Sequence, residues 1–348
     1  MRVIVTGGAG FIGSAVVRRL VARGDHVLNI DKLTYAGDLR SVAECASRPN
    51  YRFAQADVCN REAMADAFEE FRPELVLHLA AESHVDRSID EPGAFLSTNV
   101  MGTFALLETA AAYVRQSTER RAHFRMIAVS TDEVYGSLGD EGLFSEASPY
   151  APNSPYSASK AAADHLARAW HATYGLSVMI SNCTNNYGPF QNPEKLIPTV
   201  IRNALGGRPI PVYGTGRNVR DWIFVDDHVE GLLLLAGKGR VGENYLFGGA
   251  AEITNIELVR LICDILDTKC PRDDDRSYRD QIKFIADRPG HDHRYAADSS
   301  KVERELGWTR AHNLKSGLEH TVGWYLSNRS WLESIPDAGR LGLARPLH

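Results

Sequence analysis

A glycine-rich loop near the N-terminus constrains the fold of this chain more than any other feature. A β-rich run leads into the loop and a helical pattern leaves it, and the loop carries Gly7, Gly10 and Gly13. Glycines at this spacing permit a tight turn, close approach of a pyrophosphate to the helix N-terminus and close packing of helix on sheet. A second β-rich run ends at Asp31, whose carboxylate would accept ribose hydroxyls and repel a 2′-phosphate. The pattern predicts a dinucleotide site that prefers NAD, although the neighbouring base Lys32 can tolerate a phosphate.

β-rich and helical stretches alternate along the first half of the chain. After the first two strands we expect strands at residues 51–56, 75–80 and 124–130, and helices near residues 61–71, 93–114 and 157–174. This alternation predicts an α/β fold, a Rossmann-type doubly wound parallel sheet. Ligands bind at the carboxyl ends of the strands in such sheets. We therefore expect Asp57, Ala81 and Thr131, which follow three of the runs, on one rim.

The sequence changes character after about residue 180. Prolines and glycines become more frequent, and the helical stretches near residues 255–266 and 299–306 are short. We predict an NAD-binding domain over residues 1–180 and a smaller α/β C-terminal lobe over residues 181–335 that holds the substrate. We also expect some of the later chain to return to the first domain.

Composition excludes several classes of partner. The 348 residues carry a formal net charge of −5, which argues against nucleic acid or an anionic membrane as the main partner. No apolar run approaches the ~20 residues of a membrane span, and the N-terminus reads as a strand and not as a signal peptide. The five cysteines form no CxxC pair and have no histidine at metal spacing, so we expect reduced thiols and no metal. These features predict a cytoplasmic protein with a small-molecule partner.

Two groups of side chains near the middle of the chain point to chemistry. Tyr156 and Lys160 are four residues apart and share a helix face, where the ammonium can depress the pKa of the phenol and make it a general base. Thr131, Asp132 and Glu133 follow a predicted strand. Plain hydride exchange at a carbinol needs no carboxylates, so the acidic pair indicates that a C–H bond is broken and a hydroxyl expelled. Because neighbours on a strand point to opposite faces, we expect the strand to turn at this triplet.

The chain resembles the nucleotide-sugar 4,6-dehydratases of the extended short-chain dehydrogenase/reductase family, most of all the members that act on dTDP-glucose. The matching stretches are residues 7–13, 31–37, 78–88, 130–136, 154–160, 185–189, 193–198, 220–222 and 287–291. The resemblance covers nearly the whole chain. The wider short-chain family shares only the glycine loop and the Tyr/Lys pair, whereas the Thr-Asp-Glu triplet marks dehydratases.

The resemblance implies an NAD that oxidises the hexose C4 hydroxyl and returns the hydride to C6 after water is lost. It implies that Tyr156 is the base for the C4 hydroxyl, that Lys160 lowers its pKa and holds the nicotinamide ribose, and that Thr131 hydrogen-bonds the C4 oxygen. Asp132 is then the acid for the C6 hydroxyl, and Glu133 is the base that removes the C5 proton.

The resemblance also implies two sets of binding residues. Those for the cofactor are Gly7, Gly10, Phe11, Ile12, Gly13, Asp31, Lys32, Leu33, Thr34, Asp57, Val58, Leu79, Ala80, Ala81, Ser83, Thr98, Tyr156, Lys160 and Asn186. Those for the nucleotide sugar are Ser83, Thr131, Asn185, Lys195, Leu196, Pro211, Val212, Tyr213, Arg220, Asn255, Arg288 and His291. One position departs from the family pattern, because His293 stands where an arginine is expected.

Several alternatives stay open at this point. The substrate could be a UDP- or GDP-hexose, and the reaction could be a 4-epimerisation, although the related epimerases lack the acidic pair. The fold could also serve a non-catalytic NAD-binding regulator, but such proteins usually lose the tyrosine or the lysine. The helices near residues 93–114 and 157–174 are rich in Ala, Leu and aromatic residues, and the resemblance implies that they pair in a homodimer as a four-helix bundle.

Overall fold

A seven-stranded parallel sheet forms the centre of the computed structural model, which describes residues 1–287 and 290–333. In sheet order the strands are β10 (Asn244–Phe247), β6 (Val178–Cys183), β5 (Arg125–Val129), β4 (Leu75–His78), β1 (Arg2–Thr6), β2 (His26–Asp31) and β3 (Tyr51–Gln55). Every neighbouring pair runs parallel. The strand order reverses between β1 and β4, which makes the sheet doubly wound. The predicted Rossmann-type fold is confirmed.

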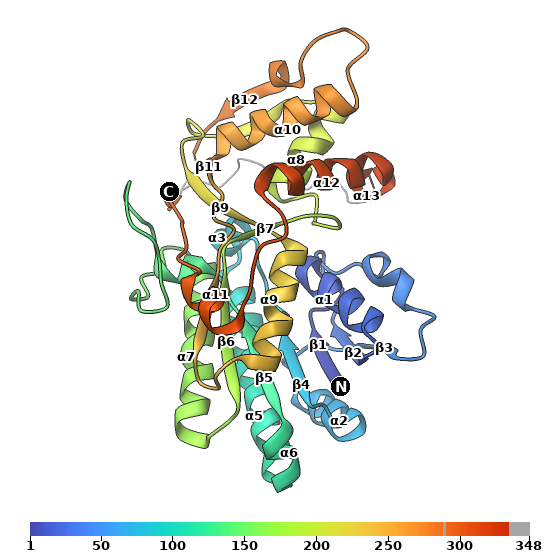
Figure 1. Cartoon of the computed structure of the whole chain (residues 1–348), viewed down its shortest axis with the longest axis vertical. Coiled ribbons are helices and arrows are strands. Elements are labelled where there is room, and N and C mark those ends of the chain that lie inside the picture. The colour runs from blue at the N-terminus through green and yellow to red at the C-terminus, as the bar shows by residue number, and fades with distance from the viewer. Residues whose placement is uncertain (288–289, 334–348) are drawn as a thin grey trace.

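Helices cover both faces of this sheet (Figure 1). On one face lie α1 (Phe11–Ala22), α9 (Val225–Lys238) and α11 (Ser300–Leu306), whose apolar side chains pack in one core cluster with β1, β4 and β5. On the other face lie α2 (Arg61–Phe71), α5 (Thr103–Arg115) and α7 (Pro155–Tyr174). Strand side chains alternate between the two clusters, as Val3 and Ile4 do on β1.

Short elements connect these layers. They are η1 (Leu39–Cys45), α3 (Val85–Asp90), α4 (Pro92–Phe95), the π-helical turn η2 (Leu96–Gly102), α6 (Thr118–His123) and the 3₁₀ turn η3 (Asp132–Tyr135). The helix predicted near residues 93–114 therefore contains a wider, underwound stretch at η2. π-Helical turns are rare and often lie at functional sites.

A smaller lobe lies above the carboxyl ends of the strands (Figure 1). It contains β7 (Asn185–Tyr187), α8 (Leu196–Leu205), β8 (Ile210–Tyr213), β9 (Val219–Phe224), β11 (Glu252–Thr254), α10 (Asn255–Lys269), η4 (Tyr278–Gln281), β12 (Ile282–Ile285), α12 (Leu314–Ser327) and α13 (Arg329–Glu333). It has a core cluster of its own, built from α8, α10, α12 and β9. The chain crosses between the layers more than once, since β10 and α11 belong to the large sheet and its helices. The predicted domain boundary near residue 180 stays a prediction.

Two further properties bear on the predicted surroundings of the protein. Within residues 1–287 and 290–333, no helix combines the length and the apolar character needed to cross a membrane. All five cysteines are unpaired, and Cys45, Cys183 and Cys263 are buried.

Candidate active site

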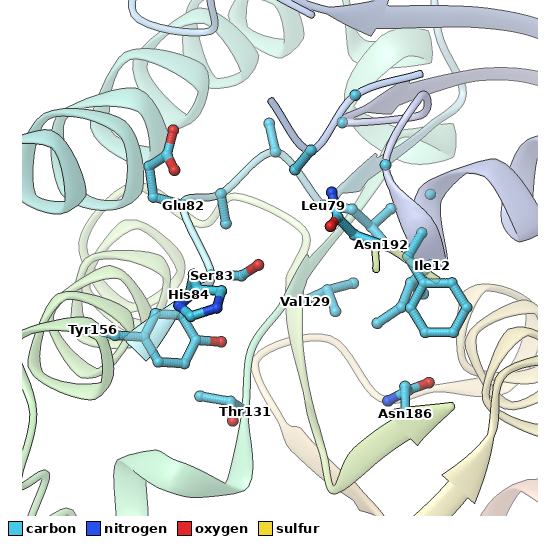
Figure 2. Close-up of a pocket in the computed structure, with 18 of the residues that line it drawn as sticks. Ile12, Leu79, Glu82, Ser83, His84, Val129, Thr131, Tyr156, Asn186 and Asn192 are labelled. Atoms are coloured by element: carbon cyan, nitrogen blue, oxygen red, sulfur yellow. The ribbon is translucent and has the colours of Figure 1, made fainter. Parts of the chain in front are cut away.

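One cavity of about 340 Å³ opens at the carboxyl ends of the strands. Most of the predicted site residues line it: Gly7, Gly10, Phe11, Ile12, Gly13, Asp31, Lys32, Thr34, Val58, Leu79, Ala80, Ala81, Ser83, Thr98, Thr131, Asp132, Glu133, Tyr156, Lys160, Asn185, Asn186, Lys195 and Leu196. Figure 2 shows Ile12 and Leu79 on one side of the cavity and Thr131 and Tyr156 on another. Segments far apart in the sequence thus meet at one site.

Other predicted residues lie outside the wall of this cavity. They are Leu33, Asp57, Pro211, Val212, Tyr213, Arg220, Asn255 and His291. Leu33 and Asp57 still belong to its rim, because Leu33 N–H donates to Asp31 at 2.8 Å and Asp57 pairs with Lys32 at 3.5 Å. Arg288 lies outside the described residues.

The glycine loop leaves no room for side chains. A Cβ on Gly7, whose φ is +72°, would lie 2.6 Å from Ala80 N, and a Cβ on Gly13 would lie 2.1 Å from Gly7 O. Only glycines therefore let this loop fold so tightly against β4 and the first turn of α1. The helix N-terminus faces the cavity with Gly10 as its cap. Such an N-terminus is suited to a pyrophosphate.

Asp31 and Lys32 are both held in place at the end of β2. The two Asp31 carboxylate oxygens accept from Ala9 N at 3.0 Å and from Leu33 N at 2.8 Å. The Lys32 ammonium donates to Thr98 Oγ1 at 3.1 Å and lies 3.5 Å from an Asp57 oxygen. The lysine charge is thus paired with a carboxylate, while Asp31 presents its negative charge to the cavity wall. This arrangement suits ribose hydroxyls better than a 2′-phosphate.

The acidic triplet lies where β5 ends and the chain turns into η3. Thr131 caps η3 by accepting from Glu133 N at 3.3 Å, so the backbone leaves the strand conformation between Thr131 and Asp132. The expected turn is present. It allows Asp132 and Glu133 to line the same cavity although they are neighbours in the chain.

Asp132 is a buried acid. It is 1% exposed, and its Oδ1 accepts a 3.3 Å hydrogen bond from the Thr131 hydroxyl. Its Oδ2 is buried and has no hydrogen-bond partner within the described chain. Burial, with the negative charge of Glu133 adding to it, raises the pKa of Asp132 well above its usual range. Its protonated form is therefore favoured, which suits the carboxyl group to donate a proton into the cavity.

Tyr156 and Lys160 lie on the first turns of α7, where Pro155 occupies the first helical position and Ser154 caps the helix. Lys160 is buried, and its ammonium donates to Val129 O at 2.7 Å. Burial raises the pKa of Tyr156 well above its usual value, Glu133 raises it further, and the hydrogen bond with Thr131 lowers it. The prediction that Lys160 lowers this pKa stays a prediction. Burial has the largest effect on the pKa of the phenol, and the Lys160 ammonium donates its hydrogen bond to a backbone carbonyl.

Predicted nucleotide-sugar residues from the smaller lobe form a second group. The Tyr213 hydroxyl donates to an Asp86 oxygen at 3.1 Å, and its ring meets the His291 ring edge-on at 6.2 Å. His291 also contacts Asp287 at 2.6 Å. Lys195 lines the cavity and donates to Ser83 O at 2.8 Å. Pro211 and Val212 precede Tyr213 on β8, and Asn255 begins α10 with a buried Oδ1 that has no partner in the described chain.

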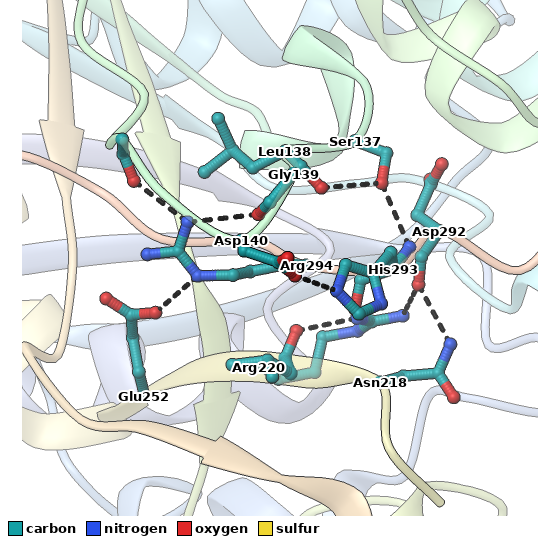
Figure 3. A network of polar contacts seen from close by, with 12 residues as sticks. Ser137, Leu138, Gly139, Asp140, Asn218, Arg220, Glu252, Asp292, His293 and Arg294 are labelled. Atoms are coloured by element: carbon teal, nitrogen blue, oxygen red, sulfur yellow. Dashed lines mark hydrogen bonds and ion pairs between the residues drawn. The ribbon is translucent and has the colours of Figure 1, made fainter. Parts of the chain in front are cut away.

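Arg220 and His293 belong to one polar network (Figure 3). The Arg220 guanidinium donates to Asp292 O at 2.9 Å and to His293 O at 3.3 Å. His293 N–H donates to Ser137 Oγ at 2.9 Å, and its exposed ring contacts Asp140 at 3.2 Å. The next residue, Arg294, is paired with Glu252 at 2.7 Å. The backbone at His293 therefore supports Arg220, whereas its side chain points away to an exposed carboxylate, so the departure from arginine falls outside the cavity wall.

Several residues that the sequence reasoning missed also line the cavity. They include Tyr35, Glu82, His84, Cys183, Thr184, Gln191, Asn192, Glu194 and Trp222. Thr184 Oγ1, Gln191 Oε1 and Trp222 Nε1 are buried without a hydrogen-bond partner in the described chain. Buried polar atoms are normally paired, so these atoms indicate a cavity built for a polar ligand. A signal was present in the sequence, since Thr184 directly precedes the motif at residues 185–189 and Trp222 ends the motif at residues 220–222.

Neither His78 nor His84 belongs to a group of side chains that could hold a metal ion within the described residues. His78 is buried between the Thr6 and Thr103 hydroxyls, at 2.8 and 3.0 Å, and burial lowers its pKa to about 3. His84 lies 3.6 Å from Glu194, and burial lowers its pKa to about 4. Both imidazoles are neutral near pH 7.

Comparison with known proteins places the chain in a family. The sequence family described as GDP-mannose 4,6 dehydratase matches residues 4–321. The dTDP-glucose 4,6-dehydratase of Neisseria meningitidis is 53% identical over 339 residues, which cover 96% of each chain. A crystal structure of the dTDP-glucose 4,6-dehydratase of Streptomyces venezuelae, with NAD and dTDP bound, is 45% identical with a TM-score of 0.88 and covers 96% of this chain and all of its own (100%).

A relative with a different reaction shares the fold at lower identity. The UDP-glucose 4-epimerase of Thermotoga maritima, solved with UDP-glucose, is 29% identical with a TM-score of 0.84 and covers 94% of this chain and 100% of its own. The dehydratases are thus the nearer relatives by sequence at a similar level of structural agreement. This chain belongs to the dTDP-glucose 4,6-dehydratase family.

Proposed function

We propose that this protein dehydrates dTDP-glucose to dTDP-4-keto-6-deoxyglucose with a bound NAD, as a step of deoxysugar biosynthesis. The observation that carries the proposal is the buried carboxyl of Asp132, whose pKa is raised, beside Glu133 and in the same cavity as Tyr156. An acid, a second carboxylate and a phenol are the groups that an oxidation followed by loss of water requires.

The first part of the cavity fits NAD. Gly7, Gly10 and Gly13 leave the α1 N-terminus open to a pyrophosphate, and Asp31 stands at the end of β2 for the ribose hydroxyls. Lys160 would hold the nicotinamide ribose. When bound, NAD supplies a positively charged acceptor for the C4 hydride and a donor for its return to C6.

The protein supplies the proton transfers. Tyr156 takes the proton of the C4 hydroxyl as the C4 hydride leaves, while Thr131 holds the C4 oxygen. The new ketone acidifies the C5 hydrogen, and Glu133 removes it as a proton. Asp132 gives its own proton to the C6 hydroxyl, which departs as water. The resulting 4-keto-5,6-ene accepts hydride at C6 and a proton at C5, so every atom and electron is accounted for.

The nucleotide part of the substrate would lie toward the smaller lobe. Lys195, Arg220 and Arg288 are the cations proposed for the diphosphate. Asn185, Asn255 and His291 would add polar contacts, and Pro211, Val212 and Tyr213 would form the wall around the base. The buried, unpartnered Oδ1 of Asn255 supports a contact with a ligand at this end.

The alternative activities have less support. An epimerisation at C4 needs hydride transfer and one base, and it gives no task to a buried carboxyl with a raised pKa at Asp132. A non-catalytic regulator needs neither Tyr156 nor Lys160 in the cavity, and both line it. The test therefore includes a UDP-hexose and a GDP-hexose beside dTDP-glucose.

The deciding experiment offers the purified protein dTDP-glucose, UDP-glucose, GDP-mannose and dTDP-galactose separately, without added cofactor. The expected product, found by mass spectrometry and NMR only with dTDP-glucose, is a 4-keto-6-deoxy sugar lighter by one water. A 4-epimer without loss of water would contradict the dehydratase assignment. A 4-keto-6-deoxy product from another nucleotide alone would overturn the substrate.

We further propose that the protein is a cytoplasmic homodimer that pairs through α5 and α7. Leu96 and Met101 are each 54% exposed, and Tyr174 at the end of α7 is 44% exposed. Half-buried Phe104 and Trp170 join α5 to α7 with ring centroids 5.7 Å apart. Large exposed apolar side chains on adjacent helices support an isologous helix-bundle contact. A monomer in sedimentation at micromolar concentration would contradict the dimer.

A further inference from the structure

The buried face of α7 carries a carboxylate for which the proposed chemistry has no task. Asp164 follows Lys160 by four residues, as Lys160 follows Tyr156, so the three side chains share one face of the helix. Asp164 is 1% exposed and lies behind the cavity, outside its lining. A buried carboxylate is costly unless it is paired and hydrogen-bonded, so its partners indicate its role.

One oxygen of Asp164 accepts three hydrogen bonds. The donors to Oδ2 are Ser130 Oγ at 2.8 Å, Tyr150 OH at 2.9 Å and Asn182 Nδ2 at 3.3 Å. The Asn182 amide also donates to Thr131 O at 3.1 Å. Ser130 immediately precedes Thr131, and Asn182 binds the Thr131 carbonyl. Two of the three donors are therefore attached to the turn that carries the acidic triplet. Asp164 therefore joins this turn to α7.

Asp164 also supplies the negative charge that faces Lys160. Burial lowers the pKa of Lys160, while the charge of Asp164 and then that of Cys183 on β6 raise it. From β4 the lysine meets His78, whose pKa of about 3 leaves it neutral. The thiol pKa of Cys183 is raised to about 12, which leaves Cys183 uncharged as well. Among these groups, Asp164 is thus the one whose ionised form favours the charged ammonium.

The other titratable side chains near Asp164 are Tyr135, Tyr150 and Arg168. Burial raises the pKa of Asp164, and Lys160 and the three donors lower it. Tyr135 and Tyr150 are protonated, since burial raises the pKa of both phenols. The Arg168 guanidinium reaches the Tyr150 hydroxyl at 3.3 Å. Lys160 and Asp164 therefore each favour the charged form of the other.

We propose that Asp164 is a positioning residue of the dehydration, which keeps the Lys160 ammonium charged and fixes the turn of Thr131, Asp132 and Glu133 against α7. The inference rests on the proposed function, because the acid, the base and the phenol must face one hexose at the same time. Small displacements of such groups strongly reduce the reaction rate. Asp164 acts through Lys160 and Ser130 and does not touch the substrate.

The test replaces the carboxylate by its uncharged isostere, Asp164→Asn. Asp164 raises the pKa of the Lys160 ammonium, so removing its charge should move the alkaline limb of the kcat–pH profile to lower pH. The KM for dTDP-glucose should keep its wild-type value, because Asp164 does not line the cavity. A kcat profile that coincides with that of the wild type would overturn the inference.

A matched control separates charge from stability. Asp227 on α9 is also buried and accepts from Ala311 N and His312 N at 3.0 Å. Asp227→Asn should lower the melting temperature and leave the pH profile in place. If Asp164→Asn fails to fold, Tyr150→Phe removes one of the three donors and should move the alkaline limb in the same direction by less. An unmoved limb in that variant would then refute the role.

The two proposals fail differently. Wild-type protein that does not turn over dTDP-glucose contradicts the proposed function. Active wild-type protein together with unshifted Asp164→Asn or Tyr150→Phe profiles contradicts only the role of Asp164.

Discussion

Replacing Asp132 by asparagine separates the loss of water from the oxidation at C4. The carboxyl is buried, and burial raises its pKa well above the usual range, which favours its protonated form. Asparagine has nearly the same shape but no acidic proton. General acid catalysis typically contributes 10²–10⁴-fold, so kcat should fall by about that factor. This loss corresponds to roughly 3–5 kcal/mol of transition-state stabilisation. Tyr156 and the cofactor site are unaffected, so the C4 hydride should still be transferred.

Rapid mixing of Asp132→Asn with dTDP-glucose gives the two rates separately. Absorbance of the reduced nicotinamide reports oxidation at C4, and mass spectrometry of quenched samples reports the loss of water. We expect reduced cofactor to form at a near wild-type rate and to persist, because its hydride has no C6 acceptor until water departs. Wild-type turnover by the variant, or an equal loss in both rates, would refute the assignment of Asp132 as the C6 acid.

The same substitution should change how stability depends on pH. The pKa of Asp132 is higher in the folded state than in the unfolded chain, so the folded state binds this proton more tightly. The stability that the group contributes is complete below its unfolded pKa of about 4 and is lost as the pH rises through its folded pKa. Asp132→Asn should therefore lose less stability than the wild type on going from acid to neutral pH, as thermal melts at a series of pH values would measure.

Three other substitutions give distinct outcomes. Tyr156→Phe removes the base for the C4 hydroxyl, so the bound cofactor should stay oxidised when substrate is added; reduction at the wild-type rate would contradict the role. Glu133→Gln should lose solvent deuterium incorporation at C5 together with turnover, as NMR of the product would reveal. Gly13→Ala places a Cβ 2.1 Å from Gly7 O, so the purified variant should carry little NAD, in contrast to a wild type that retains it.

The parts of the fold with strong local signals were predictable from the sequence. The parallel sheet follows from alternating β-rich and helical stretches, and the helix expected at residues 61–71 is α2 with the same bounds. The π-helical turn η2 was not predictable, because it depends on a tertiary contact. Asn99 within it exchanges hydrogen bonds with the Glu82 backbone at 2.8 and 3.0 Å, and nothing in the local pattern encodes that pair.

The candidate site was predictable where residues adjoin the ends of strands. Thr131, Asp132 and Glu133 line the cavity because the carboxyl ends of parallel strands meet at one edge. Contacts between the lobes could not be predicted in this way. Glu194, for example, pairs with Arg87 at 2.6 Å across 107 residues, and only the folded chain brings the two together.

Electrostatics in the cavity depend on burial, which residue spacing does not reveal. The four-residue spacing of Tyr156 and Lys160 correctly indicates one helix face, but it cannot indicate that the ammonium donates to Val129 O. Nor can it give the cost of desolvating the phenol. The rise of the Tyr156 pKa that burial causes was not predictable for this reason.

Burial acts in opposite senses on the two halves of the proposed reaction. The dry environment raises the pKa of Asp132 and so suits it to act as the acid for the leaving hydroxyl. The same environment raises the pKa of Tyr156 and lowers that of Lys160, which disfavours the ionised phenol and the charged ammonium that oxidation requires. A chain that performs both steps in one cavity must therefore offset desolvation on the α7 side alone. The Asp164 carboxylate, held by three donors behind Lys160, supplies that compensation without placing a further negative charge in the cavity beside Asp132.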